Sequence, residues 1–275
     1  MINLKDLHTI VTNRPTHNQK MPVLFVGHGS PMNGIEDNDF SRRWSQIGTE
    51  LPVPNAILCI SAHWFTRGTF ITAMERPQTI HDFYGFPQEL FDVHYPAPGD
   101  PILAKETSSL IKTTPVGLDH EWGLDHGCWT VVQRMYPDAN IPVLQLSIDG
   151  TKLPEWHYDL AKEISSLRSK GILIIGSGNI IHNLRMIDWN NPDSGFDWAN
   201  EMNENIKRLI IHEEHKKILN YPELGPAAML SIPTPEHYLP LLYVLGLKEK
   251  NENISLFNDR LLMGSVSMTS VKVGS

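Results

Sequence analysis

The sequence predicts a single α/β domain in which helices cover both faces of a mainly parallel or mixed central sheet. Short apolar runs at 21–26, 56–60 and 172–175 are bounded by turn residues, as buried strands are. Amphipathic stretches lie between these runs, and no Gly/Ser linker or internal repeat divides the chain. With 275 residues, the chain is long enough for one large domain. We expect residues 1–20 to form a peripheral N-terminal segment and residues 21–275 to form the main domain.

The first predicted unit is a strand, a helix and a second strand. The strand at 21–26 runs into a glycine turn, and Asp39–Glu50 follows with apolar residues at helical spacing. The second strand covers 56–60. A helical crossover joins parallel strands, so both strands end at the same edge of the sheet. His28 and His63, which follow the two strands, are therefore expected to emerge side by side.

The rest of the chain continues the alternation of helices and strands. A loop rich in Pro, aromatic residues and His spans 75–100, and we expect it to form one wall of a site. Asp100 is the expected N-cap of the helix that follows it. In order, the further expected elements are a helix at 101–112, a loop at 117–129, a strand at 141–149, a helix at Glu155–Lys170 that stops at Gly171, a strand at 171–175, helices at Asp197–Leu219 and Pro235–Leu245, and a strand at 263–273.

Composition excludes several classes of partner. The net charge is −8, with 23 basic and 31 acidic side chains and no dense Lys/Arg run, so we expect no nucleic-acid partner. No apolar stretch is long enough to cross a bilayer, and residues 1–20 lack an apolar signal core, so we expect a cytoplasmic protein without a membrane partner. Cys59 and Cys128 are isolated and expected to be reduced thiols, which leaves nitrogen and oxygen as metal ligands.

Four histidines occupy positions where site groups gather in α/β proteins. His28 in GHGSP and His63 in SAHW follow strands, and His182 in GSGNIIHN follows a third. His237 lies in the proline-framed loop PTPEHYLP, next to the carboxylate of Glu236. Ligand groups collect beyond the carboxyl ends of such strands, and imidazole is the commonest metal ligand in proteins. The pattern suggests one metal site, although the local signals at His182 and His237 are weaker than those at His28 and His63.

Other histidines carry weaker signals. His126 in DHG is a candidate proton donor or acceptor with Asp125 orienting its ring, and the alternative is a buried hydrogen-bonded turn residue. In the 75–100 loop, His81, His94 and Tyr84 are candidate pocket-wall residues. Five further histidines are expected on the surface or hydrogen-bonded in the core: His8, His17, His157, His212 and His215.

Six segments of the sequence match the pattern of one known family in order. They are GHGSPMN, SAHWFTRG, TIHDFYGFPQELFDVHYPAPG, GLDHGCW, SGNIIHNLR and IPTPEHYLPLLYVLG. Together they resemble the 4,5-DOPA extradiol dioxygenase family, which belongs to the class III extradiol ring-cleavage dioxygenases. The resemblance runs from about Met21 to the C-terminus and identifies residues 21–275 as an extradiol dioxygenase-like catalytic domain.

The resemblance implies a mononuclear metal, Zn²⁺ or Fe²⁺, at the centre of the domain. It implies that His28, His63 and His237 line the metal, with His182 as a further ligand or as an acid–base residue. His126 then resembles the histidine that contacts substrate or oxygen, so that His126 and His182 are the candidate catalytic pair. The family opens the ring of a catechol such as L-DOPA with O₂, which makes these two molecules the expected partners of a monomer or small homo-oligomer.

The ligand set departs from a common oxygenase pattern. Many oxygenases of this type hold iron through two histidines and one carboxylate. Here the position expected for the third ligand carries His237, with Glu236 adjacent, and a neutral third ligand suits zinc at least as well as iron. The alternative function is therefore a zinc-dependent hydrolase on the same fold, in which a zinc-bound water attacks the substrate. A non-catalytic binding protein has no support in the sequence, and a serine hydrolase is excluded because no G-x-S-x-G elbow occurs.

Overall fold

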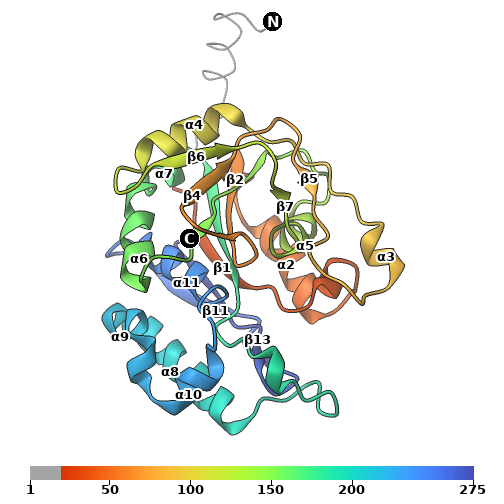
Figure 1. The fold of residues 1–275 in the computed structure, drawn as a ribbon, viewed down its shortest axis with the longest axis vertical. Coiled ribbons are helices and arrows are strands. Elements are labelled where there is room, and N and C mark those ends of the chain that lie inside the picture. The colour runs from red at the N-terminus through yellow and green to blue at the C-terminus, as the bar shows by residue number, and fades with distance from the viewer. Residues whose placement is uncertain (1–19) are drawn as a thin grey trace, which may run out of the picture.

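A six-stranded sheet runs through the centre of the molecule in the computed structural model, which describes residues 20–275 (Figure 1). Its strands in spatial order are β11 (Ile254–Phe257), β14 (Ser270–Val273), β1 (Val23–Gly27), β10 (Ile172–Gly178), β2 (Ala56–Ser61) and β8 (Val143–Gln145). Strands β1, β10, β2 and β8 pair in parallel. Strand β14 is antiparallel to both β1 and β11. The predicted mixed α/β sheet is confirmed.

Helices cover both faces of this sheet. The helices nearest to it are α2 (Asp39–Glu50) and α5 (His126–Met135) on one face, and α6 (Pro154–Glu163), α7 (Ser166–Ser169) and α11 (Leu239–Gly246) on the other. Side chains of β1 alternate between the two faces, as the pleat requires. Val23 and Phe25 join the core beneath α6 and α11, whereas Leu24 and Val26 join the core beneath α2 and α5.

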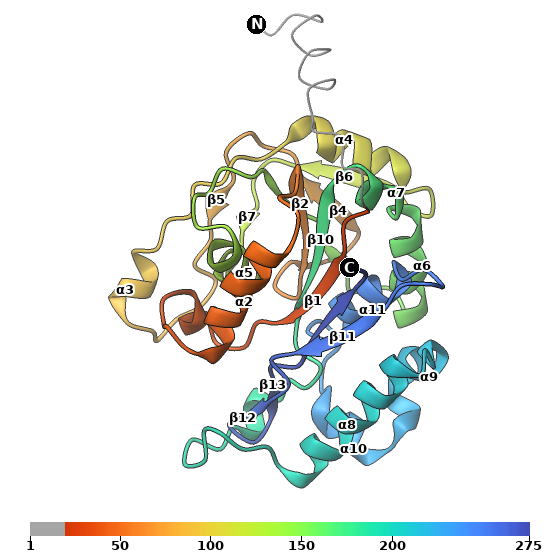
Figure 2. The ribbon, with the colours of Figure 1, turned by 180° about the vertical axis from the view of Figure 1, so that it is seen from behind.

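Shorter elements surround the sheet. The two-stranded pairs are β3 (Phe65–Thr66) with β9 (Ile148–Asp149), β4 (Thr69–Thr72) with β6 (Val116–Asp119), β5 (Gln78–Thr79) with β7 (Gly123–Leu124), and β12 (Leu261–Leu262) with β13 (Val266–Ser267). The remaining helices are α3 (Gln88–Phe91), α4 (Pro101–Leu110), α8 (Asp197–Ile211), α9 (His215–Leu219) and α10 (Pro226–Ser231), with 3₁₀ turns η1 (Pro31–Gly34), η2 (Leu184–Met186) and η3 (Tyr221–Leu224). Helices α8, α9 and α10 gather at one end of the molecule in both views (Figure 2). Among residues 20–275, no helix combines the length and apolar character needed to cross a membrane.

The parallel strands bring the first two site histidines to one edge. Both β1 and β2 pair with β10, so that Gly27 lies opposite Gly178, and Ser61 lies opposite Ser177. The common edge for His28 and His63 is confirmed, with β10 between the two strands. A Cβ atom at Gly178 would collide with the backbone carbonyl of His237, so glycine at this position permits the close approach of the His237 turn.

Some predicted elements have the predicted bounds, whereas others end elsewhere. Helix α2 has the predicted bounds, and Asp100 caps α4 by accepting a hydrogen bond from the Leu103 N–H at 2.8 Å. The strand expected at 141–149 is two strands, because the chain leaves the central sheet after Gln145 and β9 pairs with β3. The loop expected at 117–129 contains parts of β6, all of β7 and the start of α5.

Three helix predictions differ from the structure. The segment Glu155–Lys170 is divided into α6 and α7, although Gly171 ends it with a φ of 76°. The segment Asp197–Leu219 is divided into α8 and α9, because Glu213 adopts a left-handed φ of 55° that a continuous helix does not allow. Helix α11 begins at Leu239, after a turn that contains His237. The C-terminal strand is likewise two strands, β13 and β14, and the predicted N-terminal segment 1–20 lies outside the described residues except for Lys20.

Candidate metal centre

Three histidine rings converge at the carboxyl edge of the sheet. The ring centroids of His28, His63 and His237 are 5.1, 5.3 and 5.1 Å apart in the three pairs. The Nε2 atoms of His28 and His63 lie 3.2 Å from each other. Two nitrogens that bind one ion at about 2.1 Å in a tetrahedral arrangement lie roughly 3.4 Å apart. The spacing of these two nitrogens therefore suits a shared metal ion.

The surroundings of His28 direct its free nitrogen towards the centre. Its Nδ1 lies 3.0 Å from the Ser177 hydroxyl, which itself donates a hydrogen bond to the Gly127 carbonyl. The hydroxyl therefore accepts from the His28 Nδ1–H, which leaves a lone pair on Nε2. Burial, followed by the neighbouring histidines, lowers the pKa of His28 well below its ordinary value. A neutral imidazole with Nε2 free is the form that binds metals.

His237 offers a buried nitrogen that has no protein partner. Its Nδ1 lies 3.3 Å from a carboxylate oxygen of Glu236, whereas its Nε2 is buried and has no hydrogen-bond partner among the described residues. An unsatisfied buried polar atom costs about 1–3 kcal/mol. Burial also lowers the pKa of His237 well below its ordinary value, which keeps the ring neutral. A metal ion would satisfy this nitrogen, so the residues present fit such a group.

His182 lies against His237 rather than against the other two rings. The two rings stack with centroids 3.5 Å apart and an interplanar angle of 13°. Among the described residues, two groups offer ligand atoms that all lie within 4.8 Å of one another: His28, His63 and His126 form one, and His182, Glu236 and His237 form the other. Burial lowers the pKa of His182 to about 4. The structure thus brings all four predicted histidines into one cluster, with His182 at its margin.

His126 is the fifth ring of the cluster and starts helix α5. Its centroid lies 3.8 Å from that of His63 and 5.7 Å from that of His28. The prediction that Asp125 orients this ring is wrong. Asp125 caps α5 by accepting a hydrogen bond from the Cys128 N–H at 3.0 Å, and it also accepts one from the Ser61 hydroxyl at 2.7 Å. The helix takes Asp125 as its cap because the first N–H groups of a helix lack partners within the helix.

Asp82 contacts the His126 ring instead, and the sequence analysis missed it. Its Oδ2 lies 3.0 Å from Nδ1 of His126 and 3.1 Å from Nδ1 of His63, and the approach to His126 is too oblique for a full hydrogen bond. Its Oδ1 accepts a hydrogen bond from the His126 backbone N–H at 2.8 Å. Burial raises the pKa of Asp82, but the contacts with His126 and His63 outweigh burial and hold it well below its usual range.

The pKa values of the two rings that face Asp82 shift in opposite directions. Burial lowers the pKa of His63, but Asp82 and the nearby Asp125 outweigh it, so the net shift is upwards. Burial dominates at His126, where Asp82 opposes it only in part and the pKa falls. At neutral pH, His126 is therefore available as a proton acceptor.

The three candidate pocket-wall residues of the 75–100 loop differ in their surroundings, and the role of His81 stays a prediction. His81 lies 3.0 Å from the Val93 carbonyl oxygen and within 6.0 Å of the Trp129 ring. Tyr84 is 92% exposed and His94 is exposed, so neither belongs to the enclosed cluster.

The histidines assigned to the surface or core are mostly placed as predicted. His157 is buried with Nδ1 2.9 Å from the Tyr243 hydroxyl, and His212 is exposed. His215 is half-buried, with Nδ1 2.9 Å from the Tyr158 hydroxyl. The other two, His8 and His17, lie outside the described residues.

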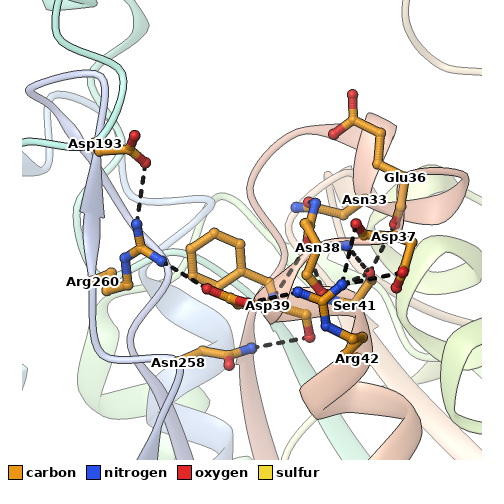
Figure 3. A network of polar contacts seen from close by, with 11 residues as sticks. Asn33, Glu36, Asp37, Asn38, Asp39, Ser41, Arg42, Asp193, Asn258 and Arg260 are labelled. Carbon is orange, nitrogen blue, oxygen red and sulfur yellow. Dashed lines mark hydrogen bonds and ion pairs between the residues drawn. The ribbon is translucent and has the colours of Figure 1, made fainter.

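A hollow of about 500 Å³ opens next to the cluster, beginning at Gly29, the neighbour of His28. The start of α2 and the C-terminal hairpin form its sides. Arg260 spans the two sides, 3.3 Å from a carboxylate oxygen of Asp39 and 3.1 Å from one of Asp193 (Figure 3). The two arginines of the hollow, Arg42 and Arg260, are thus paired with aspartates that also line it.

Comparison with known proteins decides the family. Residues 19–268 match the family described as the catalytic LigB subunit of aromatic ring-opening dioxygenase. The chain belongs to this LigB family. The LigB match spans the whole histidine cluster, and the resemblance inferred from the sequence motifs is confirmed. Its partners as a LigB dioxygenase are a small aromatic substrate and O₂.

Individual relatives narrow the class of enzyme. The chain is 51% identical to an Escherichia coli K12 protein named 4,5-DOPA dioxygenase extradiol, over 93% of this chain and 95% of the relative. It is 33% identical to a Beta vulgaris protein of the same name, over 92% and 96% of the two chains. A crystal structure of an uncharacterised Escherichia coli K12 protein covers 93% of this chain and 100% of its own, with a TM-score of 0.82 at 46% identity. This LigB protein is thus an enzyme of the extradiol ring-cleaving dioxygenase class.

Proposed function

We propose that the protein opens the ring of a catechol such as L-DOPA with O₂, using one metal ion held by His28, His63 and His237. The observation that carries the proposal is the convergence of these three rings, of which His28 and His237 are buried. Two of their nitrogens are 3.2 Å apart, and the third is buried without a partner. The names of the Escherichia coli and Beta vulgaris relatives support a catechol of the DOPA type.

In the proposed reaction, the reactants would bind to the metal, and the surrounding histidine rings would transfer protons. When bound, a metal with few protein ligands supplies open positions at which the two adjacent catechol oxygens and O₂ can meet. His126 and His182 handle the protons. Because burial lowers the pKa of both rings, each is neutral at neutral pH and can accept a proton from a catechol hydroxyl. Once protonated, the same ring can return a proton to the opened product.

The identity of the metal separates the two candidate functions. Zn²⁺ has no redox chemistry, so ring opening with O₂ favours Fe²⁺ in this ligand set. A three-histidine zinc site would instead activate water, which is the hydrolase alternative. The all-imidazole set supports both ions, and only the reaction distinguishes them.

The remaining expectations concern the cellular location, oligomeric state and domain bounds of the enzyme. We expect it to work in the cytoplasm as a monomer or small homo-oligomer, with residues 21–275 as the catalytic domain and 1–20 as a peripheral segment. The net charge of −8 supports the absence of a nucleic-acid partner.

The proposed function is tested by anaerobic reconstitution of the metal-free protein with Fe(II). L-DOPA and air are then added while O₂ uptake and the yellow ring-opened product are followed. We expect uptake coupled to product for the iron form and none for the zinc form. The exposed His212→Ala variant is the matched control and should behave as the wild type. No uptake with a range of catechols, together with ester or amide hydrolysis by the zinc form, would establish the hydrolase instead.

A further inference from the structure

We propose that Asp82 is a positioning residue that sets the ring orientation and tautomer of His63 and His126 together. The proposal rests on the proposed function for what the two rings do, but not for how they are held. One carboxylate oxygen of Asp82 faces Nδ1 of both rings, at 3.1 and 3.0 Å. A proposed metal ligand and a proposed acid–base residue are therefore joined through a single atom.

The carboxylate is itself fixed in place. Its second oxygen accepts the His126 backbone N–H at 2.8 Å, so the side chain is tied to the first residue of α5. Only 18% of the side chain is exposed. Asp125, the other carboxylate close to these rings, accepts the Ser61 hydroxyl and the Cys128 N–H on Oδ1, and its buried Oδ2 has no hydrogen-bond partner among the described residues. Asp82 differs from Asp125 in that one of its oxygens lies within 3.1 Å of both Nδ1 atoms.

A carboxylate on Nδ1 determines which nitrogen of each ring is free. An ionised carboxylate only accepts, so an oxygen 3.0–3.1 Å from both Nδ1 atoms favours the tautomer with Nδ1–H and a lone pair on Nε2, although its approach to His126 is too oblique for a full hydrogen bond. For His63, this is the nitrogen that lies 3.2 Å from the His28 Nε2. For His126, Nε2 becomes the atom that can exchange a proton with a bound molecule. Removing a carboxylate that hydrogen-bonds a metal-ligating histidine typically lowers metal affinity about 10–100-fold.

The substitution Asp82→Asn breaks this arrangement without changing the size of the side chain. An amide has one accepting oxygen and one donating NH₂ group. If its oxygen faces the two rings, the NH₂ group meets the His126 backbone N–H. If the amide is turned, the NH₂ group meets both ring N–H groups and favours the other tautomer. Either orientation sets donor against donor, so asparagine cannot replace aspartate here.

The test uses the full-length protein and needs neither catechol nor O₂. Long-range ¹H–¹⁵N NMR of histidine-labelled protein reports which ring nitrogen of His126 carries the proton, above the ordinary histidine pKa of about 6.5. A competition titration with Zn²⁺ alone reports metal affinity. The matched control is Asp92→Asn, an exposed carboxylate of the same loop region that contacts Gln88. The variant Asp82→Glu keeps the charge on a longer side chain.

We expect Nδ1–H at His126 in the wild type and a shift towards Nε2–H in Asp82→Asn. The Zn²⁺ dissociation constant should rise about 10- to 100-fold in Asp82→Asn, rise less in Asp82→Glu, and stay unchanged in Asp92→Asn. An Nε2–H tautomer at His126 in the wild type would overturn the proposal, and this reading does not depend on whether a variant folds. Wild-type zinc affinity in Asp82→Asn would overturn it as well. If the protein failed to open a catechol ring, the tautomer measurement and the Zn²⁺ titration would still test the role of Asp82.

Discussion

Two carboxylates, each in contact with two partners, occupy very different surroundings in this protein. Asp82 faces His63 and His126 with 18% of its side chain exposed. Asp39 contacts Arg42 and Arg260 with 69% of its side chain exposed (Figure 3). Exposed ion pairs are screened by water and contribute little, whereas a shielded carboxylate controls the protonation and direction of its neighbours. We therefore expect changes in the buried cluster to alter function strongly and changes in the exposed network to alter little.

The largest effect is expected for His63→Ala. This variant removes one of the two nitrogens that lie 3.2 Å apart and should abolish stoichiometric metal binding. Metal content after reconstitution and desalting measures the effect, with His212→Ala as the matched control. Full occupancy in His63→Ala would break the assignment of the buried cluster as the metal centre.

A second large effect is expected for His126→Ala, on turnover rather than on metal content. His126 is not among the proposed ligands, so the variant should retain its metal. Loss of a general acid–base group slows turnover by about 10²- to 10⁴-fold. The rate of O₂ uptake per bound metal measures this effect. An unchanged rate would return His126 to the role of a buried hydrogen-bonded residue.

A buried ring outside the cluster separates the effect of burial from that of the site. Burial lowers the pKa of His157 to about 4, from an ordinary value of about 6.5. The unfolded chain therefore takes up this proton first as the pH falls. The contribution to the free energy of unfolding is complete above about pH 6.5, is lost progressively down to about pH 4, and amounts to about 3 kcal/mol.

The variant His157→Gln removes this titration and keeps a polar group near Tyr243. Urea unfolding of the metal-free protein at about pH 7 and about pH 4.5 should show a smaller acid loss in the variant than in the wild type. The other buried histidines titrate in both proteins, so their effects cancel in the comparison. Equal losses in the two proteins would show that His157 is not held neutral by burial.

The smallest effect is expected for Arg260→Ala in the exposed network. The variant loses the contacts with Asp39 and Asp193, and the free energy of unfolding should fall by less than about 1 kcal/mol. Raising the salt concentration should diminish even this difference. A loss as large as that of a buried core contact would contradict the contrast drawn between the two carboxylates.

The sequence predicts local structure well where the signal is local. Helix α2 carries its apolar residues at helical spacing and ends before Leu51 and Pro52, so its bounds could be predicted. The order strand, helix, strand along the chain is enough to predict that the two strands are parallel. It therefore places His28 and His63 at the same edge of the sheet. The break at Glu213 could not be predicted, because a left-handed residue inside a charged helical stretch leaves no pattern.

The site is predictable only in part for a physical reason. His182 and His237 reach the cluster through tertiary packing, and only the family resemblance connected them with it. Asp82 meets His126 across 44 residues of sequence, and nothing in its loop distinguishes it from other acidic residues. Asp125, adjacent to His126 in sequence, is used by the helix cap instead.

The central claim concerns which nitrogens hold the metal, and anomalous diffraction at the zinc edge tests it most directly. The account predicts one strong peak within bonding distance of Nε2 of His28, His63 and His237 in crystals of the zinc-loaded protein. Two other ligand groups in the described part of the chain are the alternatives: His28 and His63 with His126, and His182 with Glu236 and His237. A peak held by His182 and Glu236, with His28 and His63 free, would contradict the account.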